Sequence, residues 1–293
     1  MALCKLQSAL LSLSIVAASL AARGELVLAN YSPANPVKVM AVGDSITDDC
    51  SVSGAWRQYL QPLLETNGYP FIFVGRQSSS PAGSFTKTSH EGYCGAVIAP
   101  PGVLSYAVHG YAGSDVYLQK IVRDALTNAT PDLVLLLIGV NDIGRGRDPL
   151  RVATNDMPNL LDTIFANAPK ANIILAKVTS LRNANIPGLN YAAYAANIYI
   201  YNAALQAMVN QRRALGQNVF LADMFSAVDP NTMYNSDYVH PNAAGLQAIA
   251  HEWLTRIQTI TVTSNLATCA LIQGGAVWKY STPAESEPQK TKL

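Results

Sequence analysis

The sequence predicts an α/β protein with three αβα layers around a five-stranded parallel sheet. Five short apolar runs are each followed by a helical pattern, which is the alternation expected of strands joined by crossover helices. One of these runs is apolar at every position, as a strand covered on both faces should be. The composition, 49% hydrophobic and 13% charged with a formal charge of +1, supplies enough apolar material for a core and excludes a disordered chain.

The predicted elements follow one another in a simple order. The five strands are expected at 37–42, 71–74, 133–138, 173–178 and 219–222. The run at 133–138 is the one that is apolar throughout, so we expect it in the middle of the sheet. Apolar stripes with 3.6-residue spacing predict helices around 118–126, 160–168, 194–208 and 246–257.

Two segments lie outside this pattern. Residues 76–114 are rich in Gly, Ser, Pro and Tyr and are too long for an ordinary connection, which favours a functional loop. The chain after 260 runs through a Thr/Val stretch into a polar tail that we expect to be disordered. We therefore expect one domain at 37–260 and a C-terminal extension at 261–293.

The N-terminal sequence is typical of a protein that is exported. A basic residue, an apolar stretch and small residues follow one another within residues 1–22, as in a secretory signal peptide, and residues 23–36 form a short lead into the domain. Export would make Asn30 and Asn128 candidate glycan acceptors. The expected location is secreted and extracellular.

Charge and hydropathy limit the partners that this chain can bind. The near-zero balance gives no electrostatic footprint for nucleic acid. No later apolar segment reaches the roughly 18 residues of a membrane span, so we expect no stable membrane association. Removal of a signal would leave the thiols of Cys50, Cys94 and Cys269, which can form one internal bridge at most.

The residues that follow the predicted strands are the first candidates for chemistry, because ligands of parallel sheets bind at the carboxyl ends of the strands. The first run is followed by GDSIT at 43–47, which places Ser45 on a tight turn. A lone Gly-Asp-Ser is also compatible with an ordinary turn or helix cap. Its interpretation therefore depends on the residues at the other strand ends.

Two further motifs make a catalytic interpretation of Ser45 stronger. GVND at 139–142 follows the central run, and its Asn141 amide can donate to a developing oxyanion. DYVHP at 237–241 precedes the last helix, and its spacing lets the Asp237 carboxylate reach the His240 ring. A serine, an amide, a carboxylate and an imidazole thus stand beside strand ends in one chain.

Together these blocks resemble those of the GDSL-type, or SGNH, serine hydrolases, over about residues 37–258. The resemblance implies the flavodoxin-like SGNH fold, with Ser45 as nucleophile, His240 as general base and Asp237 as the acid that orients it. It also implies an oxyanion hole made by the Ser45 N–H, a glycine N–H and the Asn141 side chain. No metal and no organic cofactor are implied.

Two segments match the glycine block of that family. HEGYCG at 90–95 resembles the form in secreted carbohydrate esterases of the acetylxylan-esterase kind and indicates Gly95, whereas HGYAG at 109–113 indicates Gly113. We favour Gly95 because its match is longer, although Gly113 stays open. A bridge between Cys50 and Cys94 is the preferred pairing, since it would tie the loop after Ser45 to the Gly95 segment.

Other histidines and rival motifs receive less weight. His251 falls on the polar face of the last predicted helix, and His90 and His109 are expected either to shape a pocket or to pack loops. A metal site would need several of His90, Glu91, His109 and Asp142 to converge, without the support of an HExxH spacing. The GxSxG elbow is absent, which argues against a lipase of the α/β-hydrolase fold.

The resulting hypothesis is a secreted serine esterase that removes O-acetyl groups from a polysaccharide through an acyl-enzyme. The expected partners are an acetylated polysaccharide or another small ester, and we expect a monomer. One alternative is a secreted lipase or phospholipase of the same fold. The other is a catalytically silent carbohydrate-binding protein on the same scaffold.

Overall fold

The computed structural model describes residues 26–48, 50, 53–80, 83–101, 104–108, 111–113, 117–181 and 190–262. In 104–108 and 111–113 only the backbone is described. The predicted signal peptide, the polar tail, His109 and Cys269 lie outside these ranges. The predictions for them stay predictions.

The five predicted parallel strands are all present. They are β2 (Val37–Gly43), β3 (Phe71–Val74), β8 (Leu133–Leu137), β9 (Asn172–Lys177) and β10 (Val219–Asp223). Their order in the sheet is β3-β2-β8-β9-β10, and each neighbouring pair is parallel. Strand β8 is the central one and is buried at every position, as predicted. The predicted α/β fold class is therefore confirmed.

The described sheet has seven strands rather than five, because part of the segment at 76–114 joins it. Strand β5 (Ser89–Gly92) pairs parallel with the last residues of β2, and β4 (Gln77–Ser78) pairs antiparallel with β5. The expectation of a loop was therefore wrong for these residues. The sequence did not indicate β5 because the strand has no apolar pattern, and its buried Glu91 is neutralised by Arg76. Two small separate sheets pair β6 (Leu104–Val108) with β7 (Tyr111–Gly113), and β1 (Leu26–Val27) with β11 (Thr261–Val262).

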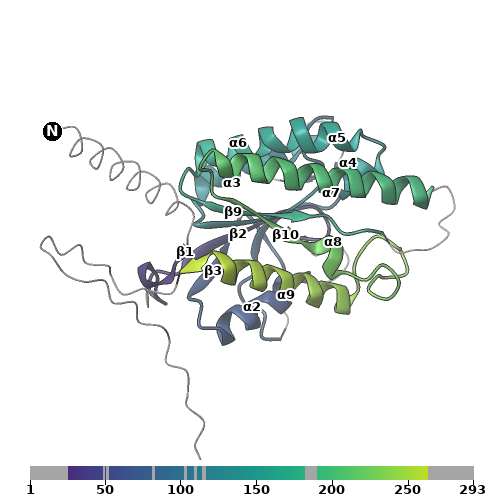
Figure 1. Cartoon of the computed structure of the whole chain (residues 1–293). Helices are drawn as coiled ribbons and strands as arrows, with labels where there is room; N and C mark the ends of the chain where they lie inside the picture. The colour runs from purple at the N-terminus through teal and green to yellow at the C-terminus, as the bar shows by residue number, and fades with distance from the viewer. Residues whose placement is uncertain are drawn as a thin grey trace, which may run out of the picture. The chain divides into compact units, whose positions relative to one another are not determined.

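Helices cover both faces of the sheet. Figure 1 shows α3 (Leu118–Asn128), α6 (Met157–Asn167) and α7 (Tyr191–Ala214) on one face, and α2 (Arg57–Thr66) and α9 (Ala243–Ile260) on the other. The four helices predicted from apolar stripes are all found. The short helical segments are η1 (Leu28–Asn30), α4 (Val140–Gly144), α5 (Pro149–Arg151), η2 (Val152–Asp156) and α8 (Met224–Ala227).

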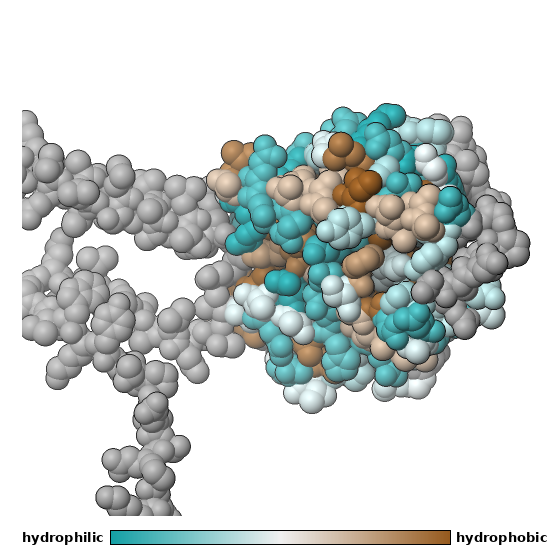
Figure 2. All heavy atoms as spheres, turned by 45° about the vertical axis from the view of Figure 1, so that its right-hand side comes forward, coloured by the Kyte–Doolittle hydropathy of each residue, from teal (hydrophilic) through white to brown (hydrophobic). Residues whose placement is uncertain are grey.

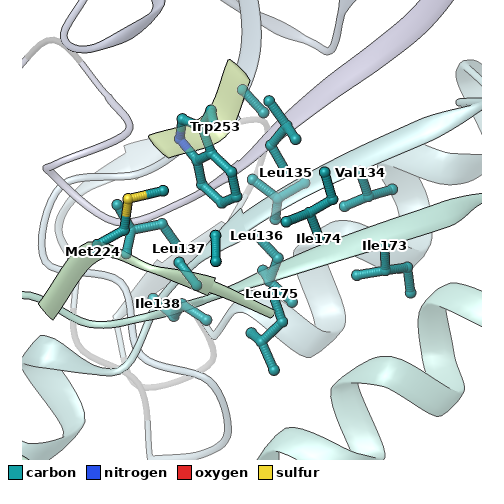
Figure 3. Packing of buried hydrophobic residues seen from close by; sticks show 14 of the residues in the cluster. Val134, Leu135, Leu136, Leu137, Ile138, Ile173, Ile174, Leu175, Met224 and Trp253 are labelled. Carbon is teal, nitrogen blue, oxygen red and sulfur yellow. The ribbon is translucent and has the colours of Figure 1, made fainter. Parts of the chain in front are cut away.

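The core consists of the central strands and the helix side chains that pack on them. Figure 3 shows the β8 and β9 side chains together with Met224 and Trp253. The Trp253 ring also packs on Trp56, which directly precedes α2, with 5.5 Å between ring centroids. Burial of each such large side chain contributes about 2 kcal/mol. This packing makes the sheet rigid, and it fixes the positions of the residues that follow the carboxyl ends of the strands.

The surface agrees with the low charge of the sequence. On the face in Figure 2, hydrophobic residues are scattered in small groups among hydrophilic ones. None of the helices in the described ranges has the length and hydropathy needed to cross a membrane.

Candidate functional site

Ser45 lies on a tight turn directly after β2. The Thr47 and Asp48 N–H groups donate to the Asp44 carbonyl at 3.0 and 2.9 Å, which closes the turn around the serine. A Cβ at Gly43 would lie 2.2 Å from the Leu137 carbonyl oxygen, so only glycine fits where the turn leaves the sheet. The Ser45 residue is 8% exposed, and this position keeps its hydroxyl at the carboxyl end of the sheet.

Asp237 and His240 lie in the loop that leads into α9. The Asp237 Oδ1 atom accepts the backbone N–H groups of Val239 and His240, both at 3.0 Å, which folds the loop around the carboxylate. Tyr238 between them has a φ of 66°, a conformation that non-glycine residues seldom adopt. Asn242 then caps α9 by accepting the Ala244 N–H at 3.0 Å.

These two loops bring the three predicted catalytic residues into contact. His240 Nε2 lies 2.8 Å from Ser45 Oγ, and His240 Nδ1 lies 2.8 Å from Asp237 Oδ2. Burial raises the pKa of Asp237, but hydrogen bonds from the His240 backbone and ring and from Val239 N–H lower it further, so its pKa lies below the ordinary value. A carboxylate that accepts the Nδ1–H leaves Nε2 free to accept a proton from the serine hydroxyl.

Two backbone N–H groups and one side-chain amide are the predicted oxyanion donors. Within the described part of the chain, neither the Ser45 N–H nor the Gly95 N–H donates a hydrogen bond to another group. The Asn141 amide donates one hydrogen to the Ala96 carbonyl at 3.0 Å and keeps a second one available. Each of the three predicted oxyanion donors therefore has a hydrogen available.

The structure places Gly95 beside the serine turn and Gly113 in a different sheet. Strand β5 runs along the end of β2, and the Tyr93 N–H that follows it donates to the Gly43 carbonyl at 3.0 Å. A Cβ at Gly92 would lie 2.5 Å from the Asp48 nitrogen, so this edge packs directly on the turn. Gly113 instead lies in β7, opposite Leu104 of β6.

The predicted disulfide is present. Cys50 and Cys94 are bridged, with 6.2 Å between their Cα atoms. The bridge joins the segment after Ser45 to the residue that precedes Gly95. It thereby supports the choice of Gly95 that the longer motif match favoured.

The described members of the alternative metal site, His90, Glu91 and Asp142, each have other partners, and His109 lies outside the described ranges. Glu91 pairs with Arg76 at 3.1 Å and Asp142 pairs with Arg147 at 3.0 Å, so the two carboxylates are neutralised separately. Among the described residues, one group has metal-ligand geometry: the Asp48 carboxylate with the sulfurs of Cys50 and Cys94. Those sulfurs form the disulfide, and hence neither is a thiolate ligand.

The two described histidines outside the site have structural positions. His90 is buried in β5, and burial together with the nearby Arg57 lowers its pKa to about 2. Its Nδ1 accepts the Gly92 N–H at 3.1 Å, so the neutral ring carries its proton on Nε2. His90 therefore packs the end of β5, which is one of its two expected roles. His251 is exposed on α9, as predicted.

Sequence reasoning missed two side chains that contact the Gly95 segment. The Asp48 Oδ2 atom accepts the Cys94 N–H at 3.2 Å, and the Arg145 guanidinium donates to the Gly95 carbonyl at 2.9 Å. Both contacts join residues more than forty positions apart. No local periodicity or motif signals such pairs, although both residues stand only a few positions from a motif residue, Ser45 or Asn141.

Asp44 directly precedes Ser45 in the turn, and it is 1% exposed. Its Oδ1 accepts the Ile46 N–H at 3.0 Å, whereas within the described residues its Oδ2 has no partner. Burial raises the pKa of Asp44 from 3.8 to about 7, with Asp142 and Asp48 adding to the rise against the lowering effect of the Ile46 bond. The folded chain thus holds this proton to higher pH than the unfolded chain does.

This difference predicts how stability depends on pH. Between about pH 4 and pH 7 the folded state binds more protons at Asp44 than the unfolded state, so stability falls as pH rises through this window and then levels off. Asp44→Asn keeps the Ile46 bond but cannot ionise. We expect this variant to have a higher Tm than the wild type at pH 8 and a similar or lower Tm at pH 5. Equal slopes of Tm against pH for both proteins would contradict the prediction.

The chain is similar to known esterases and acylhydrolases. The GDSL-like lipase/acylhydrolase family matches residues 41–248. A multidomain esterase of Ruminococcus flavefaciens is 28% identical over 241 residues, which are 78% of this chain and 29% of that protein. This chain therefore spans less than a third of that relative.

Solved structures of esterases have the same fold. A family 3 carbohydrate esterase of Clostridium thermocellum is 28% identical with a TM-score of 0.61, covering 77% of this chain and 96% of that one. A carbohydrate esterase family 3 protein of Talaromyces cellulolyticus is 25% identical with a TM-score of 0.58, covering 76% and 98%. An acetyl esterase mutant with an acetate ion is also 25% identical, with a TM-score of 0.57 and the same coverage. Since the family match extends over most of the chain, this protein belongs to the GDSL-like lipase/acylhydrolase family.

Proposed function

We propose that this protein is a secreted serine esterase that removes O-acetyl groups from a polysaccharide through an acyl-enzyme on Ser45. The observation that carries the catalytic part is the hydrogen-bonded series from Ser45 Oγ to His240 Nε2 and from His240 Nδ1 to Asp237, with 2.8 Å at each step. This is the arrangement in which an imidazole can deprotonate a serine hydroxyl while a carboxylate stabilises the imidazolium.

The proposed reaction has two steps. Ser45 Oγ attacks the ester carbonyl as His240 Nε2 takes its proton, and the oxyanion is held by the Ser45 N–H, the Gly95 N–H and the Asn141 amide. Collapse breaks the bond to the sugar oxygen, which leaves with the proton from His240. Water then attacks the acetyl-serine with His240 as base, releasing acetate and restoring the hydroxyl.

The acetyl and glycan parts of the proposal rest on the comparisons and on the sequence. The solved relatives at 25–28% identity are named carbohydrate esterases and an acetyl esterase. The HEGYCG segment at 90–95, which carries that resemblance, is the segment that holds Gly95 beside Ser45. A chain with only 13% charged residues also suits a neutral polymer as substrate.

Secretion is supported by the chemistry of the chain. The N-terminal sequence has the order of a signal peptide, and the bridge between Cys50 and Cys94 is of a kind that persists in oxidising compartments. Asn30 and Asn128, the two candidate glycan acceptors, are both exposed. We propose that the secreted protein acts as a monomer.

Two measurements test this proposal. We expect a fluorophosphonate probe to label one residue, identified by peptide mass as Ser45, and label on another residue would contradict the proposed nucleophile. We also expect acetate release from acetylated xylan, together with a steep preference for acetyl over longer acyl groups in a series of nitrophenyl esters. Greater activity on long acyl chains would favour the lipase alternative, and labelling without acetate release from any acetylated glycan would contradict the substrate.

A further inference from the structure

The peptide that carries the Gly95 N–H is restrained on both sides by side chains. The peptide before it donates its Cys94 N–H to Asp48 Oδ2 at 3.2 Å. The peptide after it accepts at its Gly95 carbonyl from Arg145 Nη2 at 2.9 Å. The proposed oxyanion donor thus lies between two peptide planes, each of which is hydrogen-bonded to a charged side chain.

The two side chains come from the segments that supply the other two donors. Asp48 closes the turn that presents the Ser45 N–H, and it is 7% exposed. Arg145 caps the C-terminus of α4, the short helix that carries Asn141, and its backbone N–H donates to the Asn141 carbonyl at 3.0 Å. The orientation of the Gly95 peptide therefore depends on the turn that carries Ser45 and on the helix that carries Asn141.

Gly95 needs such restraints because of its backbone. Its φ is 75°, and a residue without a Cβ populates this region about as readily as the ordinary one, so rotation of the adjoining peptides costs little. The bridge between Cys50 and Cys94 fixes the position of the chain but leaves peptide planes free to rotate. A hydrogen bond weakens steeply once its angle falls below about 120°, so a rotated Gly95 N–H would no longer bind the oxyanion.

We propose that Asp48 and Arg145 are positioning residues that hold the Gly95 N–H toward the oxyanion. This inference rests on the proposed function, because it requires a serine esterase with Gly95 as a donor. Neither side chain is assigned a contact with the substrate. Each acts through the peptide that it restrains.

Arg145→Ala is the sharper test, because this side chain is exposed and its removal leaves the core intact. We expect kcat to fall about 10-fold or more, less than the loss of a whole oxyanion donor, with KM little changed. Affinity for a boronic acid that forms a tetrahedral adduct on the serine should fall by a similar factor. Rates are normalised to the number of sites titrated at end point by a fluorophosphonate, which removes any effect of misfolded protein.

Conservative and matched variants separate positioning from a general effect. Arg145→Lys retains a donor near the Gly95 carbonyl and should recover part of the rate. Arg151→Ala removes an exposed arginine from neighbouring α5 and should leave kcat unchanged. Asp48→Asn keeps an oxygen for the Cys94 N–H and should be much more active than Asp48→Ala. If Asp48→Ala fails to fold, the two Arg145 variants still decide the question.

The inference is overturned if Arg145→Ala has the wild-type kcat per titrated site, which is also the result expected if Gly113 were the donor. It is equally overturned if Arg145→Ala and Arg151→Ala lose the same activity, or if kcat falls without any loss of boronic acid affinity. Failure of the proposed function would look different, since the wild-type protein itself would then bind no fluorophosphonate at Ser45.

Discussion

Ser45→Ala and His240→Ala are each expected to lower kcat by about 10⁴- to 10⁶-fold, and the double variant should be little worse than either single one. The two side chains act as one unit, because the 2.8 Å contact between Oγ and Nε2 is useful only when both atoms are present. Without the base, the hydroxyl stays protonated and is a poor nucleophile. The activity that remains in each variant comes from substrate binding and from the oxyanion donors, because neither depends on the side chain that was removed.

The measurement is kcat on an activated acetyl ester, with folding checked by thermal unfolding. His251→Ala is the matched control for His240→Ala, since His251 is an exposed histidine on α9 and should leave kcat unchanged. Losses that multiply in the double variant would show that Ser45 and His240 contribute independently. That outcome would contradict the proposed mechanism, and so would turnover by Ser45→Ala near the wild-type rate.

The fold could be predicted because its main strands and helices follow simple hydrophobic periods. Strand β8 is apolar at all positions and is buried at all positions, so its central place was readable from the sequence. Strand β5 was missed because it reads Ser-His-Glu-Gly, and its burial depends on a partner outside the strand. Arg76 neutralises Glu91, and a pairing of this kind across a loop leaves no periodic signal.

The site was predictable where its residues lie within short motifs. Asp237 and His240 are three positions apart, so their contact follows from local loop geometry. On the sequence, Gly95 was favoured over Gly113 only by the length of its motif match, because both stand in similar glycine blocks. What distinguishes them is the pairing of β5 with β2, a contact between segments about fifty residues apart. Asp48 and Arg145 were missed for the same reason, since each acts on the backbone of a distant segment.

Asp237→Asn is expected to lower kcat by about 10⁴-fold while leaving the loop folded. The asparagine oxygen can keep the two backbone bonds that Asp237 Oδ1 accepts from Val239 and His240. Its amide group, however, then faces His240 Nδ1 in place of the carboxylate. Since an amide NH₂ donates, it favours the tautomer in which Nδ1 accepts and Nε2 carries the proton. A protonated Nε2 cannot take the proton of Ser45.

Comparison with Asp237→Ala separates the two tasks of this carboxylate. The Asp237 side chain is 47% exposed, so in the alanine variant water can reach Nδ1 and accept its proton, which leaves a fraction of His240 in the productive tautomer. Alanine also removes both backbone bonds of the loop. We therefore expect Asp237→Ala to lose more Tm than Asp237→Asn but no more kcat, as measured by thermal unfolding and by turnover per titrated site. Turnover of the asparagine variant within tenfold of the wild type would contradict this prediction. It would mean that the His240 tautomer does not limit the rate and that the carboxylate serves only to fold the loop.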